Sequence, residues 1–129
     1  MKAITIKEPW ASMIAHGFKT IETRSWPTSY RGKIAIHAGK GKPDKEWMDN
    51  VPEMMEMIDG DIHPGCIVAY ADIVDCKRMT EDMIDDIKKN HAEYISGFYE
   101  PGRYAFMLDN IRRVDPIKVN GQQRLWNYD

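Results

Sequence analysis

The sequence predicts an α+β fold, in which a mixed sheet curls into a small β-barrel and the helices pack outside it. The strand-like and helix-like segments follow one another in the order β-α-β-β-α(α)-β-α-β-β. The strands are short and regular strand–helix–strand crossovers are missing, which argues against a doubly wound parallel sheet. The chain has 129 residues, of which 43% are hydrophobic. This size and composition fit one domain with one core.

The N-terminal third of the chain supplies three strands and one helix. Residues 2–6 alternate and are rich in β-branched side chains, which is typical of a strand. The helix that follows begins near Pro9, which suits a first helical turn, and ends before Gly17. Residues 19–24 and 33–38 are the next two strands, and a connection with proline and glycine separates them.

The middle of the chain is mainly helical around one long strand. Residues 44–59 have a helical pattern, but Pro52 lies inside them and is expected to split them into two short helices. Residues 66–76 form one of the most apolar segments and are predicted to be a strand. Residues 80–95 predict a helix that Thr80 caps and whose first turns are acidic.

The C-terminal part returns to strands. Residues 103–114 predict a second long strand, which Asp115 and Pro116 end in a turn. Residues 117–119 follow as a short strand, and we expect Trp126 to anchor the tail to the barrel.

Composition excludes several classes of protein. No apolar run reaches the length that a bilayer span needs. Lys7 and Glu8 interrupt the apolar core that a signal peptide would require, so we expect a cytoplasmic protein. Cys66 and Cys76 have no metal-like spacing with the four scattered histidines. We therefore expect free thiols, no metal site and no cofactor.

Charge is distributed unevenly along the chain although the net charge is only −2. Residues 1–45 carry nine Lys and Arg against three Asp and Glu, and residues 101–129 carry five against three. Residues 46–100 carry four against fourteen. If the basic ends meet in space, one face would suit an anionic ligand such as a phosphate or a short RNA. The alternative is a scattered basic excess and a solvated acidic face. The small net charge of the chain argues against double-stranded DNA as a partner, because tight binding to a duplex needs many phosphate contacts.

The segment GFKTIETR, residues 17–24, carries three charged groups directly after the predicted helix end. Glu22 and Arg24 are two apart on a strand and project from the same face, so they can pair or converge on one ligand. Lys19 has the opposite parity, but a bend near Gly17 would bring it to the same side. A carboxylate beside a lysine amine can act as acid and base or activate water. The alternative is an exposed ion pair that contributes about 0–1 kcal/mol.

The pattern G-x-K-x-x-E-x-R in this segment resembles the ASCH domain family. The opening IKEPWASMIAHG resembles the family's strand followed by a P-W helix. YRGKIAIHAGK, residues 30–40, resembles its second block, and residues 102–129 resemble its closing block with a G-x-Q/R-x-x-W ending. The resemblance covers most of the two basic ends, and the acidic middle carries little of it.

This resemblance implies a single ASCH domain over residues 1–129 with a PUA-like fold, and a cleft beside the first helix. Members of the wider superfamily bind RNA, some ASCH members are similar to small nucleases, and one branch hydrolyses the acetyl amide of a modified cytidine. That branch uses a lysine, a threonine and a glutamate. The lysine matches Lys19, and the threonine position falls on Glu22, where this sequence departs. Asp72 is the best candidate for the glutamate.

The candidate site residues follow from both arguments. Lys19, Glu22 and Asp72 are the candidate catalytic residues. Because a buried carboxylate is unfavourable unless paired, Asp72 is expected to face the cleft or meet a cation such as Lys19. The candidate ligand-binding residues are Trp10, Arg24, Arg31, His37 and Lys40. Trp10 would stack on a base or belong to the core, and Arg24 would grip a phosphate or pair with Glu22. Arg31 and Lys40 would contact phosphates or be solvated, and His37 would line the cleft or be semi-buried.

Three functions fit these residues. The first is a domain that binds RNA or a nucleotide-like small molecule. The second is a hydrolase that acts on RNA or a modified nucleoside, as a ribonuclease or a nucleoside amidohydrolase. The third is a protein-interaction module that docks a partner through the acidic helix at 80–95, for which a large exposed apolar patch is the discriminating feature. None of the three requires a membrane.

Overall fold

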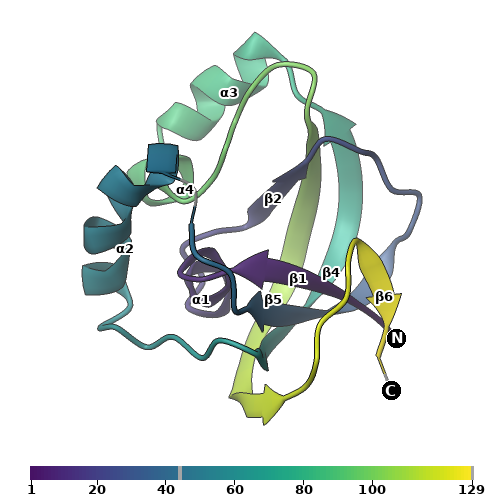
Figure 1. Ribbon diagram of the computed structural model, residues 1–129. Coiled ribbons are helices and arrows are strands. Elements are labelled where there is room, and N and C mark those ends of the chain that lie inside the picture. Colours follow the sequence, from purple (N-terminus) through teal and green to yellow (C-terminus); the bar gives the residue numbers. More distant parts are fainter. Residues whose placement is uncertain (44, 129) are drawn as a thin grey trace.

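The computed structural model describes residues 1–43 and 45–128, apart from the side chain of Glu46. A curled six-stranded sheet holds the molecule together, and short helices lie around it (Figure 1). The strands are β1 (Lys2–Lys7), β2 (Ile21–Arg24), β3 (Gly32–Gly39), β4 (Cys66–Arg78), β5 (Tyr104–Lys118) and β6 (Leu125–Asn127). The helices are α1 (Trp10–Ala15), the 3-10 helix η1 (Lys45–Asn50), α2 (Val51–Met57), α3 (Glu81–Lys88) and α4 (His91–Ile95). The predicted α+β fold, a curled mixed sheet with flanking helices, is confirmed, and the small barrel takes the form of a half-barrel.

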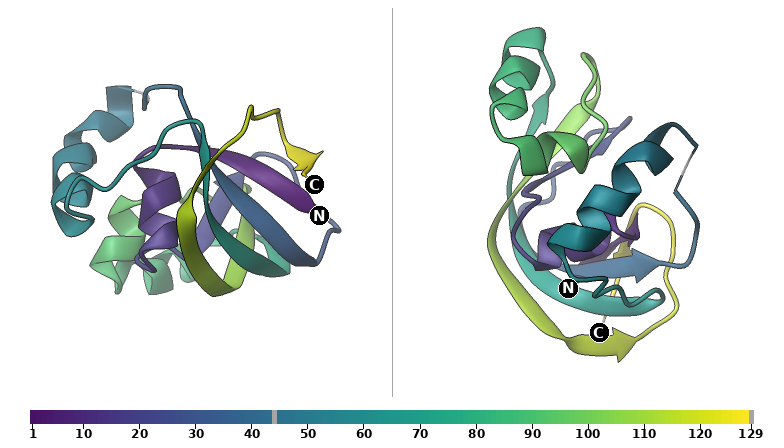
Figure 2. Two further views of the ribbon diagram at one scale, coloured as in Figure 1. Left: turned by 90° about the horizontal axis from the view of Figure 1, so that it is seen from below. Right: turned by 90° about the vertical axis from the view of Figure 1, so that its left-hand side faces the viewer.

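The strands follow the order β2-β5-β4-β3-β1-β6 across the sheet. β1 and β3 are parallel, and every other neighbouring pair is antiparallel. β4 and β5 are the longest strands, and their pairing shifts register at three places. Such bulges bend a strand and increase its twist, and the two strands curve together around α1 (Figure 2). The sheet therefore closes into a half-barrel rather than lying flat.

Most predicted elements are present, and two differ. The helix predicted over residues 80–95 is two helices, because the side chain of Asn90 accepts a hydrogen bond from the amide of Glu93 and starts α4 anew. The turn predicted at Asp115 and Pro116 is wrong, since β5 continues through both to Lys118. The split at Pro52 is confirmed, because this proline lies in the first turn of α2 directly after η1.

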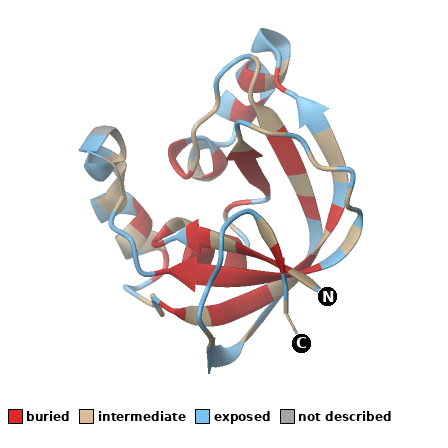
Figure 3. Cartoon of the chain, turned by 45° about the vertical axis from the view of Figure 1, so that its right-hand side comes forward, coloured by how far each residue is buried: buried red, intermediate tan, exposed pale blue. Residues whose placement is uncertain are grey.

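The main core fills the inside of the curl, where apolar side chains of β1, β3, β4 and β5 meet α1. Figure 3 shows the buried residues of these elements in red. A smaller cluster lies where the C-terminal tail crosses the sheet, and Trp126, 5% exposed, packs there on Ala3 and Ala35. The predicted anchoring of the tail by Trp126 is thus confirmed. No helix among the described residues is long and apolar enough to cross a membrane.

The half-barrel stays open between β2 at one edge of the sheet and β1 near the other. The pairing of β6 with β1 covers Lys2–Ile4 and stops before Thr5. Of the strands described, β5 alone pairs with β2. We call the gap between Thr5–Lys7 of β1 and Glu22–Arg24 of β2 the seam. It positions the site described below.

Candidate functional site

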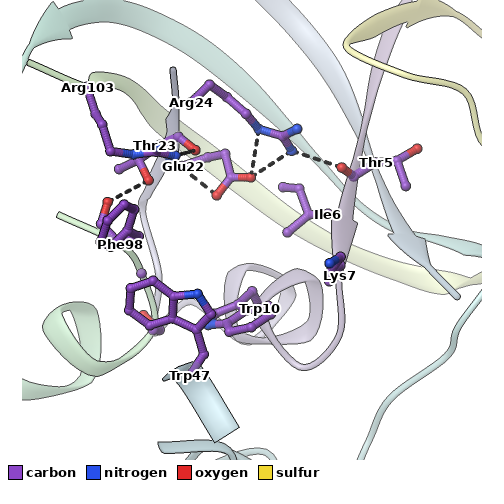
Figure 4. A pocket seen from close by; sticks show the side chains of 12 residues that line it. Thr5, Ile6, Lys7, Trp10, Glu22, Thr23, Arg24, Trp47, Phe98 and Arg103 are labelled. Atoms are coloured by element: carbon purple, nitrogen blue, oxygen red, sulfur yellow. Dashed lines mark hydrogen bonds and ion pairs between the residues drawn. The ribbon is translucent and has the colours of Figure 1, made fainter. Parts of the chain in front are cut away.

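A cleft of about 320 Å³ lies in the seam. β1 and β2 form two of its sides, and α1, η1 and the loop between α4 and β5 contribute the rest (Figure 4). The residues that line it are Thr5, Ile6, Lys7, Trp10, Glu22, Thr23, Arg24, Trp47, Ser96, Gly97, Phe98 and Arg103. The segment 17–24 therefore contributes to the cleft, as the sequence predicts, although Lys19 itself lies behind it.

Glu22 and Arg24 form the polar side of the cleft. Arg24 donates from Nη2 and Nε to Oε2 of Glu22, at 2.8 and 3.2 Å. The same Nη2 donates to the backbone carbonyl of Thr5 at 2.9 Å. The expected same-face pairing of positions 22 and 24 is confirmed, and the hydrogen bond from Arg24 to Thr5 also ties β2 to β1 across the seam.

Lys19 lies beneath the cleft rather than in it. Its side chain is 1% exposed, and its ammonium group donates to the carbonyl of Ile21 at 2.5 Å. Nζ is 3.9 Å from Oε1 of Glu22. The predicted bend after Gly17, which has a φ of 84°, does bring Lys19 to the Glu22 side. Burial lowers the pKa of Lys19, and the nearby carboxylates of Glu22 and Glu93 oppose that shift.

A second buried carboxylate supports this arrangement from α4. Oε1 of Glu93 accepts from the backbone amide and the hydroxyl of Thr20, both at 2.7 Å, and Oε2 accepts from the Tyr99 hydroxyl at 2.8 Å. Burial, and then Glu93, holds the pKa of Tyr99 above its usual range, so this hydroxyl remains a donor. Gly97 lines the cleft and lies against Lys19, since a Cβ there would be 2.8 Å from Lys19 Nζ.

Three aromatic rings and a second guanidinium complete the cleft. Trp47 of η1 packs edge-to-face on Phe98, with ring centroids 4.7 Å apart, and Trp10 opens α1 beside them. The guanidinium carbon of Arg103 lies 4.8 Å from the centroid of Phe98, and its Nη2 donates to the carbonyl of Thr23 at 3.2 Å. Nε of Arg103 is buried without a partner among the described residues. A buried donor of this kind is rare in folded proteins unless a ligand or water satisfies it.

Three of the predicted positions lie at the cleft, and Asp72 does not. Trp10, Glu22 and Arg24 line it. Asp72 lies on β4 opposite Lys33 and Asp109 and accepts from the side-chain amide of Asn110 at 3.2 Å. The expectation that Asp72 faces the cleft or meets Lys19 is therefore wrong. Half-buried at the sheet surface, Asp72 is solvated and needs no buried cation.

The other three predicted ligand-binding residues also lie outside the cleft. Arg31 is exposed and donates to the carbonyls of Thr28 and Tyr30 in its own turn. Lys40 is exposed at the far end of β3. His37 is 3% exposed because the C-terminal tail covers it.

The ring of His37 shows why it has a structural position. Its Nε2 is 2.7 Å from the carbonyl of Val119, and its Nδ1 is 3.1 Å from Oγ1 of Thr5. Trp126 packs edge-to-face on it at 5.6 Å. Both ring nitrogens therefore have protein partners, as the alternative of a satisfied histidine expects, although His37 is buried rather than semi-buried.

A second cavity of about 250 Å³ lies at the end of α1, away from the seam. Asp61 joins two histidines there: Oδ2 is 2.9 Å from Nε2 of His16, and Oδ1 is 2.7 Å from Nε2 of His63. Nη1 of Arg113 lies 3.1 Å from Nδ1 of His16. Within the described residues, no group of three His, Cys, Asp or Glu side chains is placed to hold a metal ion.

The fold and the seam cleft define the class of the protein. The ASCH domain family matches residues 4–119, so the chain belongs to this family. The resemblance inferred from the sequence blocks is confirmed. The cleft and both of its bordering strands fall inside the matched range, apart from the first two residues of β1.

Known proteins similar to this chain come from animals and bacteria. It is 24% identical to human and 23% identical to mouse activating signal cointegrator 1, over 98% of its own length. The chain spans 22% of the length of these relatives. Its fold is similar to the crystal structure of ASCH from Zymomonas mobilis, with a TM-score of 0.63, 17% identity, and coverage of 99% of this chain and 87% of that one. Crystal structures of two point mutants of that bacterial protein have TM-scores of 0.58 and 0.61.

Proposed function

We propose that the seam cleft binds RNA or a nucleotide-like small molecule. The observation that carries this proposal is that three aromatic rings and two guanidinium groups surround one open cleft. Bases stack on aromatic side chains with about 1–3 kcal/mol each, whatever their identity. Guanidinium groups bind phosphate oxygens in a bidentate manner. The two kinds of contact together are those that a nucleotide needs.

The position of Arg103 supports the same proposal. Its Nη2 is held by Thr23 and its guanidinium lies over the ring of Phe98, while Nε has no partner among the described residues. Partial burial also lowers the pKa of this guanidinium. Because an unpaired buried donor is unfavourable by about 1–3 kcal/mol, an acceptor supplied by a ligand would recover that free energy. A phosphate oxygen or a base carbonyl would serve.

The test is a titration of short single-stranded RNA into the protein, followed by tryptophan fluorescence at several salt concentrations. Binding should weaken with salt, with a slope of about 0.7 per phosphate contact. Arg103→Gln should weaken binding and reduce the slope. Arg112→Gln removes the same charge from the part of β5 outside the cleft and should have little effect. Absence of binding at low salt would contradict the proposal.

A hydrolase that acts on RNA or on a modified nucleoside is the second candidate. Glu22 favours it, because a carboxylate in a partly dry cleft can orient water. Lys19 would act from below as a charge stabiliser, since it does not reach the cleft. Incubation with RNA and with acylated nucleosides tests this candidate. If the wild type forms product and Glu22→Ala forms it at the same rate, Glu22 takes no part in the reaction.

The protein-interaction alternative receives less support. Among the described residues, the large apolar side chains that are exposed belong to separate segments, namely Met1, Met48, Val74, Tyr94 and Ile117. α3, the main part of the acidic helical region, turns Ile84 and Ile87 into the fold and its acidic residues outward. The apolar patch that this alternative requires is not formed by these side chains.

A further inference from the structure

The two carboxylate oxygens of Glu22 have different surroundings. Oε2 accepts two hydrogen bonds from Arg24, at 2.8 and 3.2 Å. Among the described residues, Oε1 has only a long contact of 3.3 Å from the amide of Thr23, and Lys19 Nζ is 3.9 Å away. An ionised carboxylate oxygen accepts hydrogen bonds and donates none. Oε1 therefore retains capacity for one further donor.

Oε1 is also placed where a ligand would reach it. Glu22 lines the cleft, and Figure 4 shows its carboxylate between Arg24 and the open middle of the pocket, with the indoles of Trp10 and Trp47 on the other side. A flat ring that stacks on an aromatic side chain presents its edge to the polar side of such a site. The atom that meets this edge is an acceptor with a negative charge.

We infer that Glu22 makes the cleft selective for a base that carries an exocyclic amino group, namely cytosine, adenine or guanine, over uracil. This inference rests on the proposed binding function and adds its specificity. An amino group donates to the carboxylate, as in carboxylate contacts to cytosine N4 in nucleic-acid complexes. Uracil offers one N–H between two carbonyl oxygens, and both oxygens would be brought near the negative charge of Glu22.

Pairs of bases with nearly the same size and shape distinguish selectivity for an amino group from selectivity for the size of the base. Cytosine and uracil differ mainly in an amino group against a carbonyl, and so do adenine and hypoxanthine. Competition experiments with short oligoribonucleotides of a single base should show binding about tenfold tighter for cytidine over uridine and for adenosine over inosine. The comparison within each pair keeps charge, length and ring size the same.

Glu22→Gln should reverse this preference. The two hydrogen bonds from Arg24 require an acceptor at the Oε2 position, so the amide oxygen would stay there. The amide NH₂ would then occupy the Oε1 position and donate toward the cleft, which favours the O4 carbonyl of uracil. The matched control is Asp72→Asn, because Asp72 is a carboxylate on the sheet outside the cleft. It should keep the wild-type preference.

The outcomes are distinct. A preference for the amino-bearing bases that Glu22→Gln reverses or abolishes supports the inference, and thermal unfolding checks that the variant is folded. Equal binding within both pairs by the wild type overturns the inference and leaves the proposed binding function standing. An unchanged preference in folded Glu22→Gln overturns the role of Glu22. If none of the oligonucleotides binds, both the inference and the proposed function fail.

Discussion

Arg24 Nη2 donates to the backbone carbonyl of Thr5 at 2.9 Å while it holds the carboxylate of Glu22 at 2.8 Å. The first contact joins β2 to β1 at the seam, where the described strands make no main-chain pairing with each other, and the second orients the guanidinium from within β2. Arg24 therefore both connects β2 to β1 and lines the cleft. A planar guanidinium can do both because it offers several donors in a fixed geometry.

Arg24→Lys should destabilise the protein and weaken ligand binding together. A lysine ammonium cannot reproduce the fork that reaches Glu22 and Thr5. Hydrogen bonds to charged groups contribute about 1.5–3 kcal/mol each, so we expect the free energy of unfolding in urea to fall by about 2 kcal/mol. Arg31→Lys is the control, since Arg31 is exposed and donates to carbonyls of its own turn. Equal effects of the two changes would refute the role of Arg24 in the seam.

Lys19→Met should lower the free energy of unfolding by about 1–3 kcal/mol. The substitution leaves the carbonyl of Ile21 without its donor and removes the amine that lies 3.9 Å from the Glu22 carboxylate. Lys88→Met on the exposed face of α3 should change it by less than about 0.5 kcal/mol. Chemical denaturation of both variants provides the measurement, and a neutral Lys19→Met would contradict the expectation.

The lowered pKa of Lys19 also predicts how stability depends on pH. The unfolded chain binds a proton at Lys19 up to its usual pKa of 10.5, whereas the folded protein releases it at a lower pH. Between these two values the unfolded state holds more protons, so the contribution of Lys19 to stability rises with pH. An NMR titration of the Lys19 side chain should give a midpoint below 10.5. A midpoint at or above this usual value would contradict the effect of burial.

Gly97→Ala should destabilise the protein and distort the cleft. A Cβ at this position would lie 2.6 Å from the Tyr99 hydroxyl and 2.8 Å from Lys19 Nζ. Neither group can withdraw freely, because Tyr99 is bound to Glu93 and Lys19 to Ile21. Overpacking of this kind lowers stability by about 1–3 kcal/mol. Gly41→Ala is the control, since its Cβ would meet the flexible side chain of Lys7 at 3.4 Å. A melting temperature unchanged in both variants would show that the backbone at Gly97 has room to move.

Asp61 should contribute to stability above about pH 4 and lose that contribution in acid. Hydrogen bonds from the His63 and His16 side chains lower the pKa of Asp61 from its usual 3.8. A carboxyl with a lowered folded-state pKa stabilises the protein above its unfolded pKa, and the effect disappears as the pH falls through the folded value. The stability difference between wild type and Asp61→Asn should therefore shrink below pH 3.8. A difference that stays constant from neutral pH into strong acid would contradict this linkage.

The order of the elements could be predicted from local signals, whereas two boundaries could not. Pro52 and the alternating apolar strands act over a few residues, so their effects are visible in the sequence. β5 runs through Asp115 and Pro116 because its neighbour β4 is paired as far as Cys66, opposite Lys118. A local turn signal does not include that partner. The helix break at Asn90 could not be predicted for a related reason. The residues on both sides favour a helix, so a single capping residue between them gives a weak signal.

The part of the site that lies on a single strand can be predicted from the sequence. Glu22 and Arg24 share a strand, and their parity was enough to pair them. Phe98 and Arg103 join the cleft only because β5 pairs with β2 and brings the loop before it to the seam. The prediction for Asp72 is wrong because it assumes that an acidic residue in an apolar strand is buried, whereas Asp72 is half-buried. Its strand borders solvent at that point, which sequence alone does not show.

The open seam has a consequence for how such a domain can diversify. In the described sheet, β1 and β2 are not paired with each other, and side chains line the gap between them. Among these, Arg24 connects the two strands by its hydrogen bond to Thr5. Substitutions at Trp10, Trp47 or Phe98 would therefore reshape the cleft without interrupting a main-chain ladder. The main-chain ladders thus hold the sheet and side chains shape the cleft, and Arg24 takes part in both.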